Sequence, residues 1–351
     1  MYLKNLSLQN FRSYAKSSFT FNEGTTIIIG PNTSGKTNLI EAIYLLASGK
    51  SFRAEKDVEM VQFGQNLSRV KGKIEDTDVE VVLAHAETAE GKQFQKKYLV
   101  NGVSKRRVDF VGNLSAVVFS PIELTIVVDS PSVRRSFLDE TLSQVDRDYR
   151  QAHITYIKTL RQRNALLERA QETGVRNEKQ FEYWDTILIR NGQMLTEKRE
   201  AFIAFINTGT KYIFDFTVIY DASIISKERL LQYKDAEVGA GVTLVGPHRD
   251  DFTIHMQTHN IKLFGSRGQQ RLVVLQLKLL QLDFMENALG VRPLLLLDDI
   301  FSELDSSHIQ LVSKMLGKQQ TMLTTTHKEF VDPTSLKLRG ASRSASVIEL
   351  G

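Results

Sequence analysis

The spacing of apolar residues predicts that the chain begins with two β-strands. Leu6 and Leu8 alternate with polar residues near the start, and Phe19 and Phe21 do so again a short distance further on. A period of two residues is typical of strands with one buried face. The segment FRSY lies between the two runs and is expected to form the turn that joins them.

A third strand and a helix are expected next. Residues 26–29 are β-branched throughout, as in a strand that is buried on both faces. Residues 38–47 then carry apolar residues at the spacing of an α-helix. The buried side of this helix would consist of Leu39, Ile40, Ile43, Tyr44 and Leu46.

Residues 70–118 have the pattern of several strands. Apolar runs occur at 79–83, 98–100 and 115–119. The run at 98–100 leads into Asn101-Gly102, a dipeptide that favours a two-residue hairpin turn. We therefore expect a β-hairpin at this point.

The pattern becomes helical after residue 131. Residues 132–213 contain no proline, and their apolar residues recur at helical spacing in three groups, at 138–145, 154–167 and 184–195. We expect three helices, forming a lobe inserted between two halves of an α/β domain. The helices lack sustained heptads, which argues against a long coiled-coil arm.

The β pattern returns near the end of the chain. Strands are expected at 216–220 and 242–245, a long apolar helix at 271–289, and buried parallel strands at 294–297 and 322–325. The expected division is 1–131 for the first part of the α/β domain, 132–240 for the helical lobe and 241–351 for the second part.

Composition limits the possible classes of protein. The 351 residues are 42% hydrophobic and 25% charged, as in ordinary globular proteins, and include no cysteine. Disulfides and thiolate metal sites are therefore excluded. Neither a signal peptide nor an apolar run long enough for a bilayer is recognisable, so we expect a cytoplasmic protein. The net charge of +4 is compatible with nucleic-acid binding without requiring it.

Residues 30–37 carry the first motif with a chemical meaning. The string GPNTSGKT matches the phosphate-binding pattern G-x-x-x-x-G-K-[ST], between an expected strand and an expected helix. Its glycines allow backbone N–H groups to face phosphates at the helix N-terminus. Lys36 would contact the β- and γ-phosphates, and Thr37 would bind Mg²⁺.

Two carboxylates end the apolar run at 294–297. Hydrolysis of a nucleotide requires one acid to support Mg²⁺ and another to polarise water. Asp298 suits the first role and Asp299 the second. A strand followed by a capping Asp would give the same letters, but the phosphate-binding loop makes that alternative weaker.

Three further strings complete the set. SRGQQR at 266–271 precedes the long apolar helix, where Ser266 and the Gly268 backbone could bind an anion. SELD at 302–305 directly follows the double Asp. His327 ends a threonine-rich strand and could sense the γ-phosphate. SELD would form a loop between subunits, whereas SRGQQR and His327 each also have a purely structural interpretation when taken alone.

Together these strings resemble the ABC-type ATPases of the SMC and Rad50 class, and within that class the RecF family of bacterial recombination mediators. The resemblance extends from end to end. Besides the ATP motifs it rests on FRSY at 11–14, KSFR at 50–53, VNG at 100–102, FSPIEL at 119–124, SPSVRRSFLDE at 130–140 and GPHRDD at 246–251. The glutamine usual in the Q-loop of this class is not evident, and Glu123 stands near its place.

The resemblance implies an α/β fold of the ABC-type ATPase head, with a mixed sheet around the phosphate loop and an inserted helical lobe. It implies ATP and Mg²⁺ as cofactors, Mg²⁺ being held by Thr37 and Asp298. Catalysis would depend on Lys36, Asp298, Asp299 and His327. The nucleotide contacts would be Gly30, Pro31, Asn32, Thr33, Ser34, Gly35, Lys36, Thr37, Asn38, Arg12, Ser266, Arg267, Gly268, Gln269 and Asp305, with Arg53 also near the nucleotide.

The same resemblance implies how the protein works. ATP would lie between the phosphate loop of one subunit and SRGQQR of the other, in a homodimer with twofold symmetry. This dimer would clamp duplex DNA at gaps, and slow, DNA-stimulated hydrolysis would reset it. The implied partners are RecR, RecO and RecA, in recombinational repair and replication restart.

A DNA clamp needs basic residues directed at phosphates. The expected candidates lie near the predicted hairpin and in the helical lobe. They are Lys92, Lys96, Lys97, Lys105, Arg106, Arg107, Lys158, Arg161 and Arg163. Each cluster could equally be solvated surface.

Two other classes of protein remain open. An ATPase subunit of a membrane transporter should carry an LSGGQ signature and a clear Q-loop, and neither is present. An ATPase of a Rad50-like nuclease complex would be expected to have a long coiled coil or a zinc hook. A partner nuclease stays open on the sequence alone.

Overall fold

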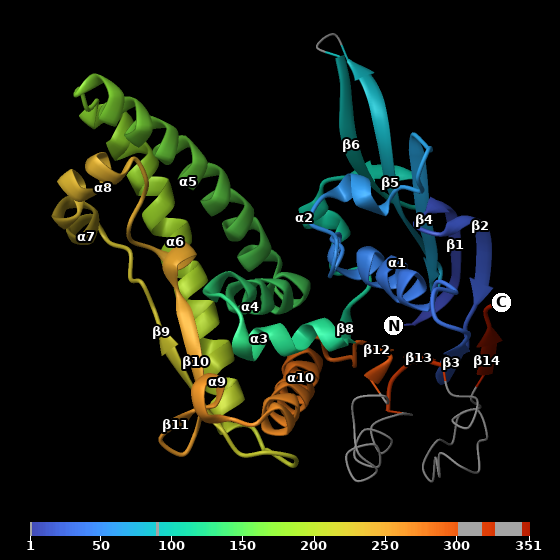
Figure 1. The fold of residues 1–351 in the computed structure, drawn as a ribbon. Coiled ribbons are helices and arrows are strands. Elements are labelled where there is room, and N and C mark those ends of the chain that lie inside the picture. Colours follow the sequence, from blue (N-terminus) through green and yellow to red (C-terminus); the bar gives the residue numbers. More distant parts are fainter. Residues whose placement is uncertain (1, 89–90, 301–317, 327–345) are drawn as a thin grey trace. The chain divides into compact units, whose positions relative to one another are not determined.

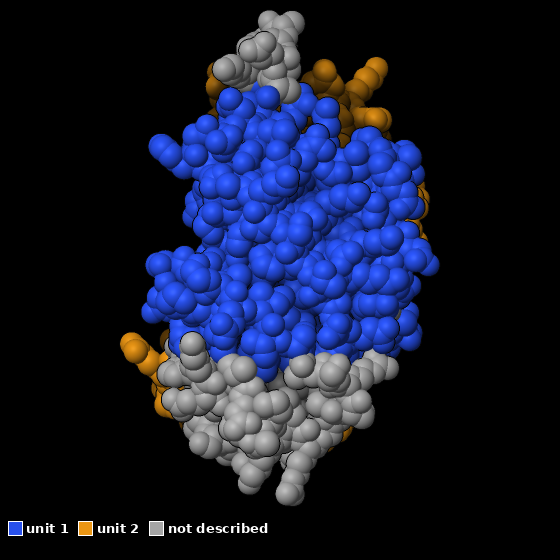
Figure 2. All heavy atoms as spheres, turned by 90° about the vertical axis from the view of Figure 1, so that its right-hand side faces the viewer, with its two compact units in different colours: residues 1–123, 281–351 blue, residues 124–280 orange. Residues whose placement is uncertain are grey.

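In the computed structural model, residues 2–88, 91–300, 318–326 and 346–351 are described. The chain divides into two compact units (Figure 2). Unit 1 consists of residues 1–123 and 281–351, and unit 2 of residues 124–280.

Unit 1 contains an antiparallel sheet of six strands (Figure 1). Its order is β2-β1-β4-β5-β6-β7. The strands are β1 (Leu3–Phe11), β2 (Tyr14–Thr20), β4 (Leu67–Ile74), β5 (Thr77–Thr88), β6 (Gly91–Val100) and β7 (Val103–Lys105). The expected hairpin at Asn101-Gly102 is confirmed, since both residues have positive φ (50° and 77°) between paired strands.

A second sheet in unit 1 is parallel, in the order β14-β3-β13-β12-β8. Its strands are β3 (Thr25–Ile29), β8 (Ala116–Phe119), β12 (Leu294–Asp298), β13 (Thr321–Thr325) and β14 (Ser346–Glu349). Every residue of β3, β8, β12 and β13 is buried. The apolar runs therefore behave as core parallel strands, as expected.

Helix α1 (Lys36–Ser48) packs against strands of both sheets. Eleven of its thirteen residues are buried, so the helix has no solvent-exposed face of the usual kind. Leu39, Ile43 and Leu46 join Leu6 of the antiparallel sheet and Leu296 of the parallel sheet in one core. This packing fixes the position of the loop before α1. Unit 1 also contains the short helices η1 (Asp57–Met60), α2 (Arg107–Phe110) and η2 (Pro121–Leu124).

Unit 2 is largely helical. Helices α4 (Pro131–Val145), α5 (Arg147–Thr173) and α6 (Glu178–Thr208) are the three expected helices. A three-stranded sheet, β11-β10-β9, accompanies them. The remaining elements are α3 (Thr125–Val128), β9 (Thr217–Asp221), α7 (Lys227–Gln232), α8 (Lys234–Ala240), η3 (Pro247–Arg249), β10 (Asp251–Met256), β11 (His259–Asn260) and α9 (Ile261–Phe264).

The expected strand at 242–245 is wrong. These residues belong to no strand, because side chains rather than a neighbouring strand accept their backbone N–H groups. Thr243 N donates to Asn164 Oδ1 (3.0 Å), and Leu244 N donates to Glu237 Oε1 (2.9 Å). Residues 241–280 also group with the helical lobe, whereas the sequence predicts that the α/β domain resumes at 241. Helix α10 (Arg267–Leu289) is shared between the two units.

Candidate nucleotide-binding site

The phosphate-loop sequence lies between a buried strand and a buried helix. β3 ends at Ile29 and α1 begins at Lys36. A Cβ atom on Gly30 would lie 2.5 Å from Ser34 Oγ and 2.6 Å from the Leu350 carbonyl oxygen. Gly35 has a φ of 98°, which disfavours any residue with a Cβ. The loop path therefore depends on both glycines.

The FRSY turn supports this loop from the antiparallel sheet. The Tyr14 hydroxyl donates a hydrogen bond to the Gly35 carbonyl oxygen (3.1 Å). Burial raises the pKa of Tyr14 to about 12, so the hydroxyl keeps its proton at neutral pH. The end of the loop is thus fixed to β2.

The Lys36 side chain folds back over the loop. Its ammonium group donates to the carbonyl oxygens of Gly30 and Pro31, both at 2.8 Å. Burial lowers the pKa of Lys36, while the carboxylates of Asp299 and Asp298 act in the opposite direction. A cation thus lies beside the N-terminus of α1, where anions are already favoured.

Asp298 connects the phosphate loop with the parallel sheet. Its Oδ1 accepts hydrogen bonds from Thr37 Oγ1 (3.0 Å) and from Thr324 Oγ1 (2.8 Å). Burial raises the pKa of Asp298, and the bonds from Thr324 and Thr37 oppose that change. A hydroxyl and a carboxylate in contact are the oxygen ligands through which Mg²⁺ is held at phosphate-binding loops.

Asp299 leaves the end of β12 in an unusual conformation. Its φ is 50°, and its backbone N–H donates to Thr324 Oγ1 (2.9 Å). Its side chain is less buried than that of Asp298. The two carboxylates expected from the sequence therefore have different environments, as two different roles require.

The residues present fit a nucleoside triphosphate with Mg²⁺. Ser34 Oγ is buried in the loop without a hydrogen-bond partner, so a polar group at the loop could use it. The glycine-dependent loop, the lysine and the Thr37–Asp298 pair all lie at the carboxyl ends of parallel strands, where α/β proteins bind ligands.

Glu41 is a site residue that sequence reasoning missed. It lies on α1 and its side chain is fully buried. Its two oxygens accept hydrogen bonds from Arg12 (2.7 and 2.9 Å), and they also accept bonds from Arg53 (2.9 Å) and Ser51 (2.6 Å). An acidic residue in an otherwise apolar helix was the only signal in the sequence.

The two arginines have different partners besides Glu41. Arg12 Nη1 donates a hydrogen bond to the Glu59 carbonyl oxygen (2.6 Å). Arg53 instead bonds Asn38, directly after Thr37, and Asn38 Nδ2 donates to Ser13 Oγ (2.8 Å). Arg53 also acts on the pKa of Asp298 by lowering it. Arg53 therefore acts on the carboxylate of Asp298, at the end of β12.

The SRGQQR string forms the start of α10, and its first residues lie in unit 2. Gln269 N donates to Ser266 Oγ (3.3 Å), and Ser266 N donates to Gln269 Oε1 (2.8 Å). This reciprocal pair is a capping box. Ser266, Arg267 and Gly268 are exposed. The string is therefore a preorganised helix N-terminus open to solvent.

The structure brings together the site residues of unit 1, namely the loop from Gly30 to Asn38 with Asp298 and Asp299. Ser266, Arg267, Gly268 and Gln269 belong to unit 2. Asp305 and His327 lie outside the described residues. Their expected roles stay predictions.

Several expected DNA contacts have partners inside the protein. Lys96 pairs with Asp57 (2.7 Å), and Arg107 donates to the Ser48 carbonyl oxygen (2.9 Å). Arg163 is fully buried and bonds Asp185, Thr243 and Glu237. The expectation for Arg163 is therefore wrong, because a charged side chain that is buried in the core needs its own internal partners. Lys96 and Arg107 are only partly buried. Arg106 is 73% exposed and pairs with Asp109, while Lys97, Lys105, Lys158 and Arg161 are exposed; the side chain of Lys92 is not described.

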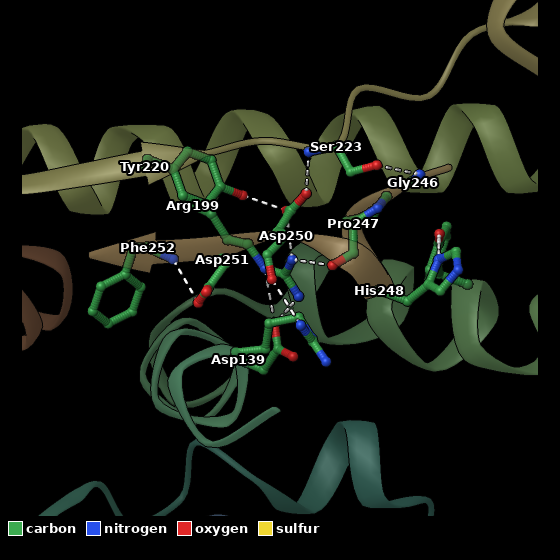
Figure 3. Close-up of polar contacts among 12 residues, drawn as sticks. Asp139, Arg199, Tyr220, Ser223, Gly246, Pro247, His248, Asp250, Asp251 and Phe252 are labelled. Atoms are coloured by element: carbon green, nitrogen blue, oxygen red, sulfur yellow. Dashed lines mark hydrogen bonds and ion pairs between the residues drawn. The ribbon is translucent and has the colours of Figure 1, made fainter. Parts of the chain in front are cut away.

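The GPHRDD string belongs to a buried network in unit 2 (Figure 3). Arg199 on α6 is at its centre and donates to Asp139, Asp250 and the Pro247 carbonyl oxygen, each at 2.7 Å. Tyr220 also donates to Asp250. One arginine thereby links α4, α6 and the GPHRDD segment.

The SPSVRRSFLDE string joins the same network. Arg134 donates to both oxygens of Asp251 (2.6 and 2.9 Å), and Arg135 donates to the Asp250 carbonyl oxygen (2.7 Å). The Tyr156 hydroxyl and His248 Nδ1 share a hydrogen bond (2.7 Å). Burial lowers the pKa of His248 to about 4. The GPHRDD and SPSVRRSFLDE strings thus stabilise the lobe together.

The described residues lack two other features. No described helix has the length and hydropathy needed to cross a membrane. Among the described residues, no group of three or more His, Asp or Glu side chains is placed to hold a metal ion.

The fold and the site define a phosphate-loop ATPase head of the ABC class, which confirms the expected fold class. The family described as the RecF/RecN/SMC N-terminal domain matches residues 2–343. The DNA replication and repair protein RecF of Moorella thermoacetica is 37% identical over 338 residues, covering 92% of this chain and 90% of that protein. RecF of Bacillus thuringiensis is 33% identical over 96% of this chain and 95% of its own length.

A solved structure gives the same result. The recombination mediator protein RecF with ATP, of the RecFOR pathway, has a TM-score of 0.85 at 32% identity, with 93% of this chain and 92% of that chain covered. The chain belongs to the RecF family of DNA replication and repair proteins.

Proposed function

We propose that the protein is an ATP-dependent DNA-binding recombination mediator. The observation that carries the proposal is the hydrogen bond from Thr37 to Asp298, because it joins the two expected Mg²⁺ ligands at the phosphate loop. Bound Mg²⁺ would neutralise charge on the β- and γ-phosphates. The known ATP complex of a relative that is 32% identical supports ATP as the nucleotide.

The residues of unit 1 have separate roles in binding and hydrolysing ATP. Lys36 and the N-terminus of α1 bind the phosphates, and Thr37 with Asp298 holds the metal. Asp299 accepts a proton from the attacking water, since it is a second carboxylate next to the first. His327, after β13, senses the γ-phosphate. Arg53 supplies positive charge near Asp298.

ATP binding would assemble a homodimer. Ser266 is exposed, and among the described residues its hydroxyl accepts the capping bond from Gln269 alone, so its proton can be donated to a phosphate oxygen. The string lies in a different compact unit from the phosphate loop. We propose that it binds the γ-phosphate of ATP held by the partner subunit, with Asp305 at the same interface.

The dimer would clamp duplex DNA at gaps and help RecR and RecO direct RecA onto the single strand. Support comes from the relatives, which are DNA replication and repair proteins and a mediator of the RecFOR pathway. Slow hydrolysis, stimulated by DNA, would open the clamp.

Mass in solution tests this proposal. Light scattering measures the mass of the Asp299→Asn protein in the presence of ATP-Mg²⁺ and a gapped duplex. Each of these two components is omitted in turn. We expect a dimer only with ATP, and retention of DNA by that dimer. A monomer under every condition, with no DNA bound, would contradict the clamp and favour an ATPase subunit of a transporter or nuclease complex.

A further inference from the structure

The outer face of the six-stranded sheet carries a regular array of basic residues. Side chains on β4 alternate between the core and solvent, and Arg69, Lys71 and Lys73 all point outward. Cross-strand pairing places Lys16 beside Gln9 and Gln9 beside Arg69. On the other side, Arg69 pairs with Val82 and Val82 with Lys97. One row of the sheet thus carries Lys16, Arg69 and Lys97 across five strands.

The next two rows each carry one basic and one acidic side chain. Lys71 lies between Ser7 and Glu80, and Lys73 lies between Asn5 and Asp78. Ser18 and Thr20 on β2 complete these rows. We call these three rows the outer sheet face. Its remaining side chains toward β1 and β2 are polar and uncharged, so they leave the lysines accessible.

The outer sheet face has a net positive charge. It carries five basic side chains (Lys16, Arg69, Lys71, Lys73, Lys97) and two acidic ones (Asp78, Glu80), a net charge of +3 in a chain of +4. Both acids are already in ion pairs, Glu80 with Arg69 (3.0 Å) and Asp78 with Lys71 (2.8 Å). Among the described residues, Lys16, Lys73 and Lys97 have no acidic partner, and all three are exposed.

The spacing of the array suits a sugar-phosphate backbone. Alternate residues of a strand are about 6.8 Å apart, and neighbouring strands are about 4.8 Å apart. Basic groups therefore recur every ~7 Å along β4 and every ~10 Å across the row. The face carries no aromatic side chain in its three rows, so it offers no platform for stacking unpaired bases. Lysine, serine and asparagine instead suit contacts to phosphates.

We propose that the outer sheet face of unit 1 binds the phosphate backbone of duplex DNA. The inference rests on the proposed function, because it names the surface that a DNA clamp would use. It differs from the sequence expectation, which placed the contacts at the hairpin and in the helical lobe. Figure 1 shows β2, β1 and β4 side by side, with α1 on the other side of the sheet.

The main test removes the three unpaired lysines. The variant Lys16→Gln/Lys73→Gln/Lys97→Gln is compared with wild type for binding to a fluorescent duplex across a series of salt concentrations. Each phosphate contact contributes about 0.9 to the slope of log affinity against log salt. We expect the slope to fall by about 2.7, and affinity at about 0.1 M salt to fall roughly tenfold per lysine that contacts a phosphate.

A matched control loses the same charge elsewhere. Lys179, Lys227 and Lys318 are exposed lysines outside the array, and their triple change to Gln gives the same net charge. We expect this control to keep the wild-type slope. Equal slopes for the two triple variants would overturn the proposal, and the array would then be ordinary solvated surface or a site for an acidic protein.

Crosslinking locates the DNA directly. The natural chain has no cysteine, so Ser7→Cys places a single thiol in the centre of the outer sheet face. Thr258→Cys, in the exposed turn between β10 and β11, is the control. A duplex that carries thiol-reactive groups on its backbone should react at position 7 and not at 258. Reaction at 258 alone would refute the assignment.

The outcome separates this inference from the proposed function. Wild type that forms an ATP-dependent dimer and binds DNA, with unchanged binding by the Lys16/Lys73/Lys97 variant, would refute only the surface. Wild type that binds no duplex at any salt concentration would refute both.

Discussion

Glu41 offers the sharpest test of how the nucleotide site is held together. The side chain is fully buried on α1, where it accepts hydrogen bonds from Arg12, Arg53 and Ser51. The change Glu41→Gln preserves its shape and removes its charge. Two guanidinium groups would then face a neutral amide, of which one end donates rather than accepts hydrogen bonds.

The size of the effect follows from burial. Removing one partner of a buried ion pair costs about 3–5 kcal/mol, because the other charge stays without compensation. Arg12 and Arg53 are partly exposed (19% and 28%), so water offsets part of this cost and we expect about 3 kcal/mol. For a unit of about 200 residues, that loss lowers Tm by roughly 6–12 °C.

Circular dichroism during heating measures the effect, and Asp78→Asn is the control. Asp78 also pairs with a cation, Lys71, but the two side chains are 38% and 50% exposed. A surface ion pair of this kind contributes about 0–1 kcal/mol to the free energy of unfolding, so the Tm of the control should fall by at most a few degrees. If Glu41→Gln unfolds within about 2 °C of wild type, the argument from burial is refuted.

A second measurement links Glu41 to ATP. Arg53 bonds both Glu41 and Asn38, so loss of the Glu41 charge should release it from the loop. We expect weaker equilibrium binding of a fluorescent ATP analogue at a temperature where the variant is folded. In the double variant Glu41→Gln/Arg12→Gln, the two losses of stability should not add, because the residues share one ion pair. Strict additivity would contradict direct coupling.

Three further predictions concern separate sites. Lys36→Ala removes the cation at the phosphate loop and should abolish binding of the ATP analogue; unchanged affinity would contradict its assignment. Ser266→Arg should leave ATP binding intact and block ATP-dependent dimers in light scattering, whereas normal dimers would refute action on a partner's nucleotide. His248 is held neutral, with its pKa lowered from 6.5 to about 4 by burial. As pH falls below 6.5, His248 gains a proton in the unfolded chain before it does so in the folded protein. The stabilising contribution of the neutral imidazole is therefore present above pH 6.5, and about 3 kcal/mol of the free energy of unfolding is lost by pH 4. Urea unfolding followed by the fluorescence of the single tryptophan, Trp184 of unit 2, measures this loss. The change His248→Gln should reduce the pH dependence of the free energy of unfolding by that amount. An equal pH dependence in both proteins would exclude His248 as its source.

Much of the fold follows directly from the sequence pattern. The buried parallel strands, the hairpin turn at Asn101 and the three long helices all lie where the spacing of apolar residues places them. The strand expected at 242–245 is wrong for an identifiable reason. The backbone N–H groups of this segment and of Gly246 bind Asn164, Glu237 and Ser223, and apolar spacing carries no information about such partners.

The residues that contact a nucleotide were predictable because the ligand imposes their spacing. A phosphate loop needs glycines and a lysine at set intervals, and Thr37 and Asp298 do meet as its chemistry requires. Charge alone was a poorer guide. Arg161 and Arg163 cannot be distinguished by sequence, and in the structure Arg163 is a core residue while Arg161 is exposed.

The features that were missed share a physical cause. Glu41 acts on other side chains rather than on a ligand, so no ligand geometry fixes its spacing in the sequence. The outer sheet face depends on strand register, which places Lys16, Arg69 and Lys97 in one row although they come from three separate segments. A shift of one residue in β4 would turn Arg69, Lys71 and Lys73 into the core. The buried Val70 and Ile74 prevent that shift, and the same apolar residues that stabilise the sheet therefore keep its basic side chains directed to solvent.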